Sequence, residues 1–137
     1  MIKLIVKVGH FTFDACLEEK LAPNTCAAFK ASMPFTGEVV HVRWSGEGVW
    51  MPLGDREFGV GYENPTSHPA PGHIILYPGG ISETEILLAY GAVDFSSKIG
   101  QIAGNHFITL TSHLEDLPKM GNVVLWEGAQ PIEFKLN

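Results

Sequence analysis

Apolar and polar residues alternate over the first part of the chain. Ile2, Leu4 and Val6 fall on one side of this pattern, and lysines fall on the other. A period of two is typical of β-strands that bury one face. The pattern resumes after a glycine turn, so the sequence predicts a β-hairpin of residues 2–8 and 11–17. This alternating, charged start is also unlike a signal peptide.

Short apolar runs separated by turn residues continue along the chain, which contains 15 glycines and 9 prolines. Runs bounded in this way are typical of strands. The further strands expected are residues 39–44, 49–53, 73–77, 85–90, 99–103, 106–110, 123–126 and 132–136. Residues 54–72, rich in Gly, Pro, Asn and His, are expected to form a long ordered loop, which in a compact domain often carries function.

Two segments have helical signals. Residues 22–33 carry Pro23 in the first turn and apolar side chains at helical spacing, and a proline follows them. Ser112 and Glu115 have the spacing of a capping box, which predicts a short second helix that ends before Gly121.

The number and order of these elements favour one domain that spans residues 1–137. We expect a mainly β fold, a closed antiparallel β-barrel capped by the two helices. Closure buries many short strands without leaving exposed edges. The outer strands, residues 2–8 and 132–136, leave open a homo-oligomer in which strand edges pair between chains.

Composition excludes several classes of protein. The chain has 45% hydrophobic and 18% charged residues, which rules out a disordered chain. Its 15 carboxylates against 9 Lys and Arg give a net charge of −6, without a basic cluster, which argues against nucleic acid or an anionic membrane as partner. No run approaches the ~20 apolar residues of a membrane span. Cys16 and Cys26 lack metal-site spacing and are expected to stay reduced in the cytoplasm.

The motifs of metal and cofactor sites are missing from the sequence. None of the six histidines forms His-x-His or His-Glu-x-x-His. Nucleotide-binding and nucleophile-elbow motifs are missing as well. We therefore expect no metal and no cofactor.

Three segments resemble cyclophilins in order and rough spacing. Residues 22–25, Ala-Pro-Asn-Thr, followed by Phe29, are similar to the start of the first cyclophilin helix. Residues 104–109 resemble a Gly-Ser-Gln-Phe-Phe-Ile-Thr strand, and residues 117–124 resemble the stretch that follows it. The whole chain looks still more like a bacterial family of small proteins with a cyclophilin-like fold and no established activity. This resemblance implies a fold and no reaction.

The cyclophilin site carries over only in part. The resemblance implies that Arg43, Asn105 and Phe107 take the positions of the catalytic arginine, a glutamine and the pocket phenylalanine. Met51 stands where cyclophilins have another glutamine, and the tryptophan and histidine of the proline pocket are replaced. Prolyl isomerase activity is therefore not expected.

A binding cleft is expected around Arg43, whose planar fork suits a carboxylate or an amide carbonyl. Strand alternation places His41 on the same face, and His41 or His106 could move a proton. Trp44, Trp50, Tyr62, Tyr77, Tyr90 and Phe107 form an aromatic group suited to pocket walls. The predicted catalytic residues are His41, Arg43 and His106, and the predicted ligand-binding residues are Arg43, Trp50, Glu63, Tyr77, Tyr90, Asn105 and Phe107.

Residues 57–97 hold carboxylates but no Lys or Arg. Such a segment would suit a cationic ligand or a metal, or form a solvated acidic face. Glu83 and Glu85 are two apart and so share a face of a strand, where paired carboxylates can divide acid and base roles. Exposure at a turn is the simpler interpretation of both side chains.

The function expected from these residues is the binding of a small polar metabolite, a carboxylate or a cyclic amide. Whether that ligand is also converted stays open. The alternative is a module that binds a peptide or protein in the groove that cyclophilins use. A change of Arg43 to alanine separates the two, because a broad interface has many other contacts.

Overall fold

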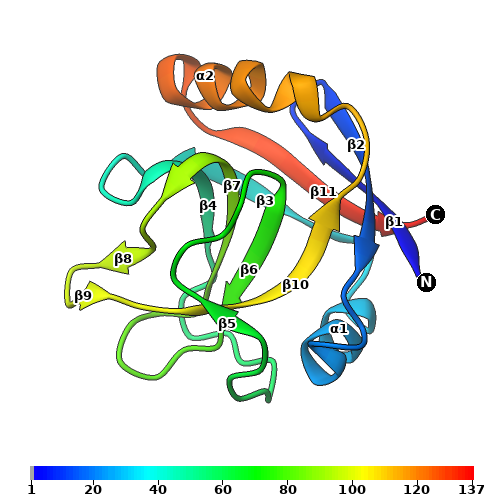
Figure 1. Cartoon of the computed structure of the whole chain (residues 1–137), viewed down its shortest axis with the longest axis vertical. Coiled ribbons are helices and arrows are strands. Elements are labelled where there is room, and N and C mark those ends of the chain that lie inside the picture. Colours follow the sequence, from blue (N-terminus) through cyan, green and yellow to red (C-terminus); the bar gives the residue numbers. More distant parts are fainter. Residues whose placement is uncertain (1) are drawn as a thin grey trace.

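Eight antiparallel strands close into a barrel in the computed structural model, which describes residues 2–137 (Figure 1). Around the barrel the strands follow the order β2 (Phe11–Leu17), β1 (Lys3–Val8), β11 (Gln130–Leu136), β3 (Phe35–His41), β4 (Gly46–Pro52), β7 (Glu85–Val93), β6 (His73–Tyr77) and β10 (Gly104–Leu110). Pairing of β10 with β2 closes the circle. The expected closed antiparallel barrel is confirmed.

The predicted N-terminal hairpin is formed by β1 and β2. Leu4 pairs with Ala15 and Val6 with Phe13, and these side chains point into the barrel core. Gly9 has a φ of +58°, a conformation that glycine adopts without steric cost, so the tight turn is possible at this position.

Closure removes the strand edges that the sequence left open for pairing between chains. β1 pairs with β2 and β11, and β11 pairs with β1 and β3. The backbone groups of both strands are therefore used within the barrel, and neither strand offers the free edge that such pairing would need.

Three two-residue strands lie outside the barrel circle. β5 (Pro65–Thr66) pairs with the end of β10 and is the only strand found within the predicted long loop of residues 54–72 in the described chain. β8 (Ser96–Ser97) and β9 (Gly100–Gln101) pair with each other, in a small hairpin beside β4 and β7 (Figure 1).

Two α-helices lie at opposite ends of the barrel (Figure 1). α1 (Pro23–Lys30) confirms the first predicted helix, although it ends earlier than expected. The 3₁₀ turn η1 (Leu114–Asp116) leads into α2 (Leu117–Glu127). None of the helices within residues 2–137 has the length and apolar character needed to cross a membrane.

The expectations for the second helix were wrong in three respects. α2 continues through Gly121, and residues 123–126, expected as a strand, form its last turns. Glycine is a poor helix former, but here it lets α2 approach the barrel: a Cβ at Gly121 would collide with the ring of Tyr90. The capping box also fails to form, because the hydroxyl of Ser112 bonds to Asp14 instead.

Strand boundaries differ from the prediction around residue 43. β3 begins at Phe35 and ends at His41, and a turn joins it to β4, with the amide of Ser45 donating to the carbonyl of Val42 at 2.8 Å. Arg43 therefore lies in this turn and is exposed, whereas a mid-strand position was expected.

Both faces of β7 are buried, in two separate apolar clusters. Ile86 and Leu88 point into the barrel interior, and Leu87 and Ala89 point to the outer face. There they pack with Phe95 and other residues of the segment that joins β7 to β10 outside the barrel circle. This explains why β7 reads as a continuous apolar run and not as an alternating one.

Candidate functional site

A groove of about 820 Å³ opens beside the outer cluster. Its lining comes from Trp44, Trp50, residues 81–83, Glu85 and residues 96–99, and we call it the tryptophan groove. The barrel supplies one wall through β4 and β7, and the β8–β9 hairpin supplies the other. A concave site of this size is in the usual range for small-molecule pockets, about 300–1,000 Å³.

Two tryptophans form the aromatic wall of the groove. The rings of Trp44 and Trp50 lie 5.6 Å apart between centroids and meet nearly at right angles, at 82°. Trp44 is 58% exposed, while Trp50 packs partly against the outer cluster. The indole N–H of Trp44 donates to the carbonyl of Ser96 at 3.2 Å, which fixes the ring against the opposite wall.

Apolar side chains also stand at the rim. Ile81 is 82% exposed and Ile99 is 54% exposed, and both line the groove. Isolated exposed apolar residues are common on protein surfaces, but here they surround a concave site together with two tryptophans. The groove therefore offers apolar surface that a ligand could cover.

A buried carboxyl group lies in the lining. Glu85 begins β7, opposite Tyr77 of β6, and only 4% of the residue is exposed. Desolvation raises the pKa of Glu85 to about 7; the nearby Trp50 indole opposes this rise, and the charge of Glu83 adds to it. At neutral pH this carboxyl group is thus poised between its two protonation states.

The indole nitrogen of Trp50 is a second unused polar group. Its Nε1 is buried and has no hydrogen-bond partner within residues 2–137. The indole is close enough to influence the Glu85 carboxyl, yet the two groups do not meet with hydrogen-bond geometry. Buried polar groups without partners are rare and costly, so this pair needs an explanation.

The walls of the groove are tied together by hydrogen bonds. The hydroxyl of Ser45 donates to the carbonyl of Ser96 at 3.2 Å and accepts from the amide of Ser96 at 3.1 Å. The hydroxyl of Tyr77 accepts from the amide of Ser82 at 3.3 Å. Tyr77, predicted as a wall residue, therefore supports the lining from within the outer cluster.

Three other predicted residues come together elsewhere. The ring of His41 meets the hydroxyl of Tyr90 at 2.6 Å, under α2, and Arg43 lies close to both. Desolvation and the charge of Arg43 lower the pKa of His41. None of the three lines the tryptophan groove.

His106 belongs to a separate polar cluster on β10. Its ring stacks on that of His73, 3.9 Å away at 9°, and its Nε2 lies 2.8 Å from the hydroxyl of Thr109. That hydroxyl donates to Glu18 at 2.6 Å. Desolvation lowers the pKa of both histidines, the charge of His73 lowers the pKa of His106 further, and Glu18 opposes these effects.

We expect this histidine pair to make the protein less stable in mild acid. The unfolded rings titrate near 6.5, whereas the folded rings take up protons only at lower pH. At these two rings the unfolded state therefore binds more protons below that value, and the contribution of the pair to the free energy of unfolding falls as the pH drops from about 7.5 to about 5.5. The His73→Gln variant should lose less stability over this interval in urea titrations. An unchanged loss would contradict the assignment.

Glu63 and Asn105 have partners within the fold. The carboxylate of Glu63 accepts from the backbone amides of Thr25 and Asn24, at 2.6 and 3.3 Å, at the start of α1. Desolvation opposes its ionisation, but these bonds outweigh that effect and lower the pKa of Glu63. Asn105 is fully buried; it accepts from the amide of Glu63 and donates to Thr25 and to the carbonyl of Gly61.

Phe107 lies in the barrel core. Its ring is fully buried and meets that of Phe29 edge-on, 5.1 Å away. It presents no surface to a ligand in this structure. The predicted site residues are thus divided among several places, and of them Trp50 lines the groove directly while Tyr77 supports it.

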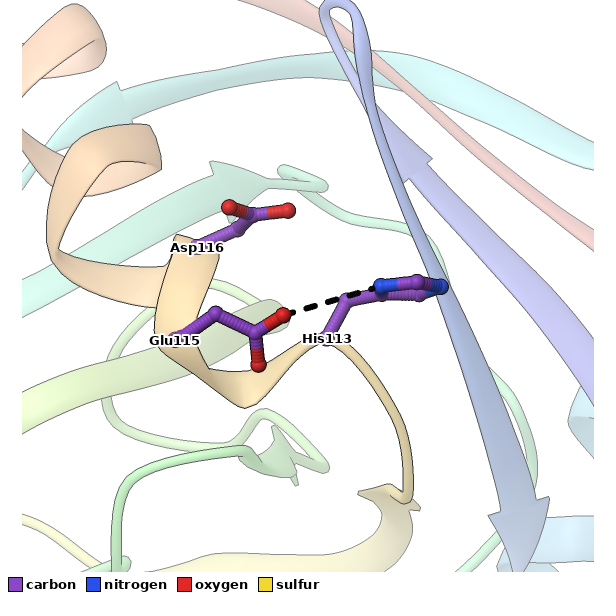
Figure 2. Close-up of side chains that lie close together, drawn as sticks. All are labelled: His113, Glu115 and Asp116. Carbon is purple, nitrogen blue, oxygen red and sulfur yellow. Dashed lines mark ion pairs between the residues drawn. The ribbon is translucent and has the colours of Figure 1, made fainter.

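One group of side chains has metal-ligand character in the part of the chain that the structure describes. Ligand atoms of His113, Glu115 and Asp116 lie within 4.8 Å of one another before α2, and Figure 2 shows the first two as an ion pair. That pair is 3.8 Å long and exposed, and Asp116 lies 3.9 Å from the ammonium group of Lys119. Each acidic side chain of this cluster thus has a basic neighbour of its own.

Sequence reasoning missed much of the groove lining. The sequence favoured an exposed position at a turn for Glu85, whereas the structure buries this side chain. A glutamate that begins the longest apolar strand was the available signal for burial. No local signal could place residues 81–83 or 96–99 in the groove, because they reach it only through the folding of the segment outside the barrel.

The barrel is shared with solved structures of low sequence identity. The structure described as McbB in complex with tryptophan has a TM-score of 0.68 and 13% identity over 96% of this chain. This chain spans 44% of the length of that protein. The hypothetical protein AF2241 from Archaeoglobus fulgidus has a TM-score of 0.59 and 14% identity, with 99% of this chain and 95% of that chain covered. These likenesses show the fold.

Sequence comparison with curated proteins gives no match. Nearly the whole chain, residues 4–136, matches a family described as protein of unknown function (DUF3830). The chain therefore belongs to the DUF3830 family.

Proposed function

We propose that the tryptophan groove binds a small molecule with a flat aromatic or heteroaromatic ring. The observation that carries the proposal is the edge-to-face pair of Trp44 and Trp50 in the lining of the 820 Å³ groove. A third ring can stack on or meet the open face of Trp44, which is 58% exposed. A ring N–H, as in a cyclic amide, would find an acceptor in Glu85.

The neighbouring fold supports a ligand of this class. McbB, whose solved structure contains tryptophan, shares the barrel at a TM-score of 0.68. The carboxylate ligand expected from the sequence depended on Arg43, which lies outside the groove beside His41 and Tyr90. We therefore still propose a small-molecule ligand, but one held by Trp44 and Trp50 and not by Arg43.

Binding through the cyclophilin groove has less support from the geometry. Phe107, which the resemblance places in a proline pocket, is fully buried against Phe29. Asn105 uses its side-chain amide on Thr25 and Gly61. Neither residue offers a free surface or a free polar group to a peptide.

Titration with indole, the simplest ring of this class, tests the proposal. We expect indole to perturb the NMR signals of Trp44, Trp50 and the β8–β9 hairpin. The Trp44→Ala variant should bind indole about tenfold more weakly, because it loses the exposed aromatic wall but leaves the outer cluster in place. Isothermal titration calorimetry on both proteins provides the affinities.

The matched control is Trp126→Ala. Trp126 is 76% exposed on α2 and does not line the groove, so this variant should bind indole as the wild type does. Signal changes confined to another surface, or equal affinities for Trp44→Ala and wild type, would refute the proposed function.

A further inference from the structure

We propose that the ring ligand of the tryptophan groove carries a protonated amine, and that Glu85 is its counter-ion. This inference depends on the proposed function, since it names the class of ligand for the same site. It places the ring of the ligand against Trp44 and Trp50 and its cationic group against the buried carboxylate. The ligand class is thus an aromatic amine of the size of tryptamine.

Glu85 is isolated from the cationic side chains that the structure describes. The residue is 96% buried, yet it lines the groove, and no cation within residues 2–137 forms an ion pair with it. A buried carboxylate without a partner is costly, and a bound cation would compensate that cost. The Nε1 of the adjacent Trp50 favours the carboxylate form of Glu85 but meets no acceptor with good hydrogen-bond geometry within residues 2–137.

The groups that face Glu85 are negative or uncharged. Glu83 lies two residues before it in the same lining, and its charge adds to the preference for a cation. Tyr77, opposite on β6, and Trp50, on neighbouring β4, are uncharged. Lys98 is the one cationic side chain of the groove, and it is exposed on the β8–β9 hairpin.

The aromatic wall of the groove also favours a cationic ligand. Indole faces attract cations through their negative π surface, and tryptophan is the strongest of the aromatic side chains in this respect. Two tryptophans and a buried carboxylate in one groove therefore favour an amine over a carboxylate ligand. Lys98 lies in solvent, where its attraction for an anion is screened.

Proton release should accompany binding. Near neutral pH part of the protein holds Glu85 in its protonated form, which cannot pair with an ammonium group. Binding of the amine favours the carboxylate, so the proton leaves Glu85 for the solvent. Affinity for the amine should consequently fall when the pH is lowered from about 8 to about 6, whereas affinity for indole should change little.

Three probes with one ring and different charge test the inference: tryptamine, indole and indole-3-acetate. At about pH 8 we expect tryptamine to bind at least tenfold more tightly than indole, and indole-3-acetate more weakly than either. Calorimetry at about pH 7 in two buffers of different ionisation enthalpy should reveal proton release with tryptamine alone.

Variants separate this inference from the proposed function. Glu85→Gln should lose both the preference for tryptamine over indole and the proton release. Glu127→Gln, the same change at an exposed position of α2, should keep both. Binding of indole without preference for tryptamine, or tightest binding of indole-3-acetate, would overturn the inference and leave the proposed function standing. Failure of all three probes to bind would refute both.

Discussion

We expect the Glu85→Gln variant to be more stable than the wild type at about pH 8, by up to about 3 kcal/mol, and to have almost the same stability at about pH 4.5. The folded protein holds Glu85 with a pKa of about 7, against 4.5 for an unperturbed glutamate. Because the folded pKa is raised, the folded state keeps a proton that the unfolded state has already lost. The contribution of Glu85 to the free energy of unfolding of the wild type therefore falls as the pH rises between these values, and it is opposite in sign to the contribution of the His73–His106 pair.

Urea titrations of both proteins at about pH 4.5, 6 and 8 provide the measurement. The neutral amide of glutamine has no charge to desolvate, so the variant should lack this pH-dependent loss. Glu127→Gln serves as the control for the change in net charge, because Glu127 is exposed. A stability difference that does not change with pH would show that Glu85 is not held in its protonated form by burial.

A carboxyl group that lowers stability and lines a groove is typical of a functional position. Binding sites commonly keep polar groups that the folded state alone would do better without. If Glu85→Gln gains stability and loses the preference for tryptamine, the two results together would show that the side chain that destabilises the fold is the one that selects a cationic ligand.

The Asn105→Ala variant is expected to lose about 3 kcal/mol of stability without losing affinity for indole. Asn105 is fully buried and makes three hydrogen bonds, to the amide of Glu63, the hydroxyl of Thr25 and the carbonyl of Gly61. Alanine would remove all three bonds, of which the one to Thr25 is buried and the other two are partly buried. A buried group left without its partner costs about 1–3 kcal/mol, and relaxation and water recover part of the loss at the other two.

The measurement combines urea unfolding with calorimetry of indole on the folded variant. Asn122→Ala, at an exposed position of α2, is the control and should change stability little. Asn105 was predicted from the sequence as a ligand-binding residue. An Asn105→Ala variant that keeps its stability but no longer binds indole would restore that role and contradict the structural one.

Elements that depend on local pattern were predictable. The β1–β2 hairpin follows from strict alternation around a glycine turn, and α1 follows from Pro23 and helical spacing. Residues 123–126 were not predictable in this way, because a short apolar run fits a strand and a helix equally well. Contact with the barrel at Gly121 decides in favour of the helix.

The candidate site was predictable only in its aromatic component. Trp44 and Trp50 stood out by residue type, and the structure brings them together. The burial of Glu85 has a cause that the local pattern does not show, since β6 and the segment that follows β7 supply the side chains that pack on the outer face of β7. Asn105 and Glu63 carry polar groups that sequence reasoning assigns to a ligand, but their partners come from distant parts of the same chain.

The two walls of the tryptophan groove differ in how strand pairing fixes their positions. Trp50 and Glu85 belong to barrel strands, so their positions are fixed by the pairing of β4 and β7. Lys98 and Ile99, by contrast, are exposed on the β8–β9 hairpin, whose strands pair only with each other. If the groove binds the proposed ligand, the hairpin would act as an exchangeable specificity loop: its length and side chains could be altered, in evolution or by design, while the barrel strands continue to present Trp50 and Glu85.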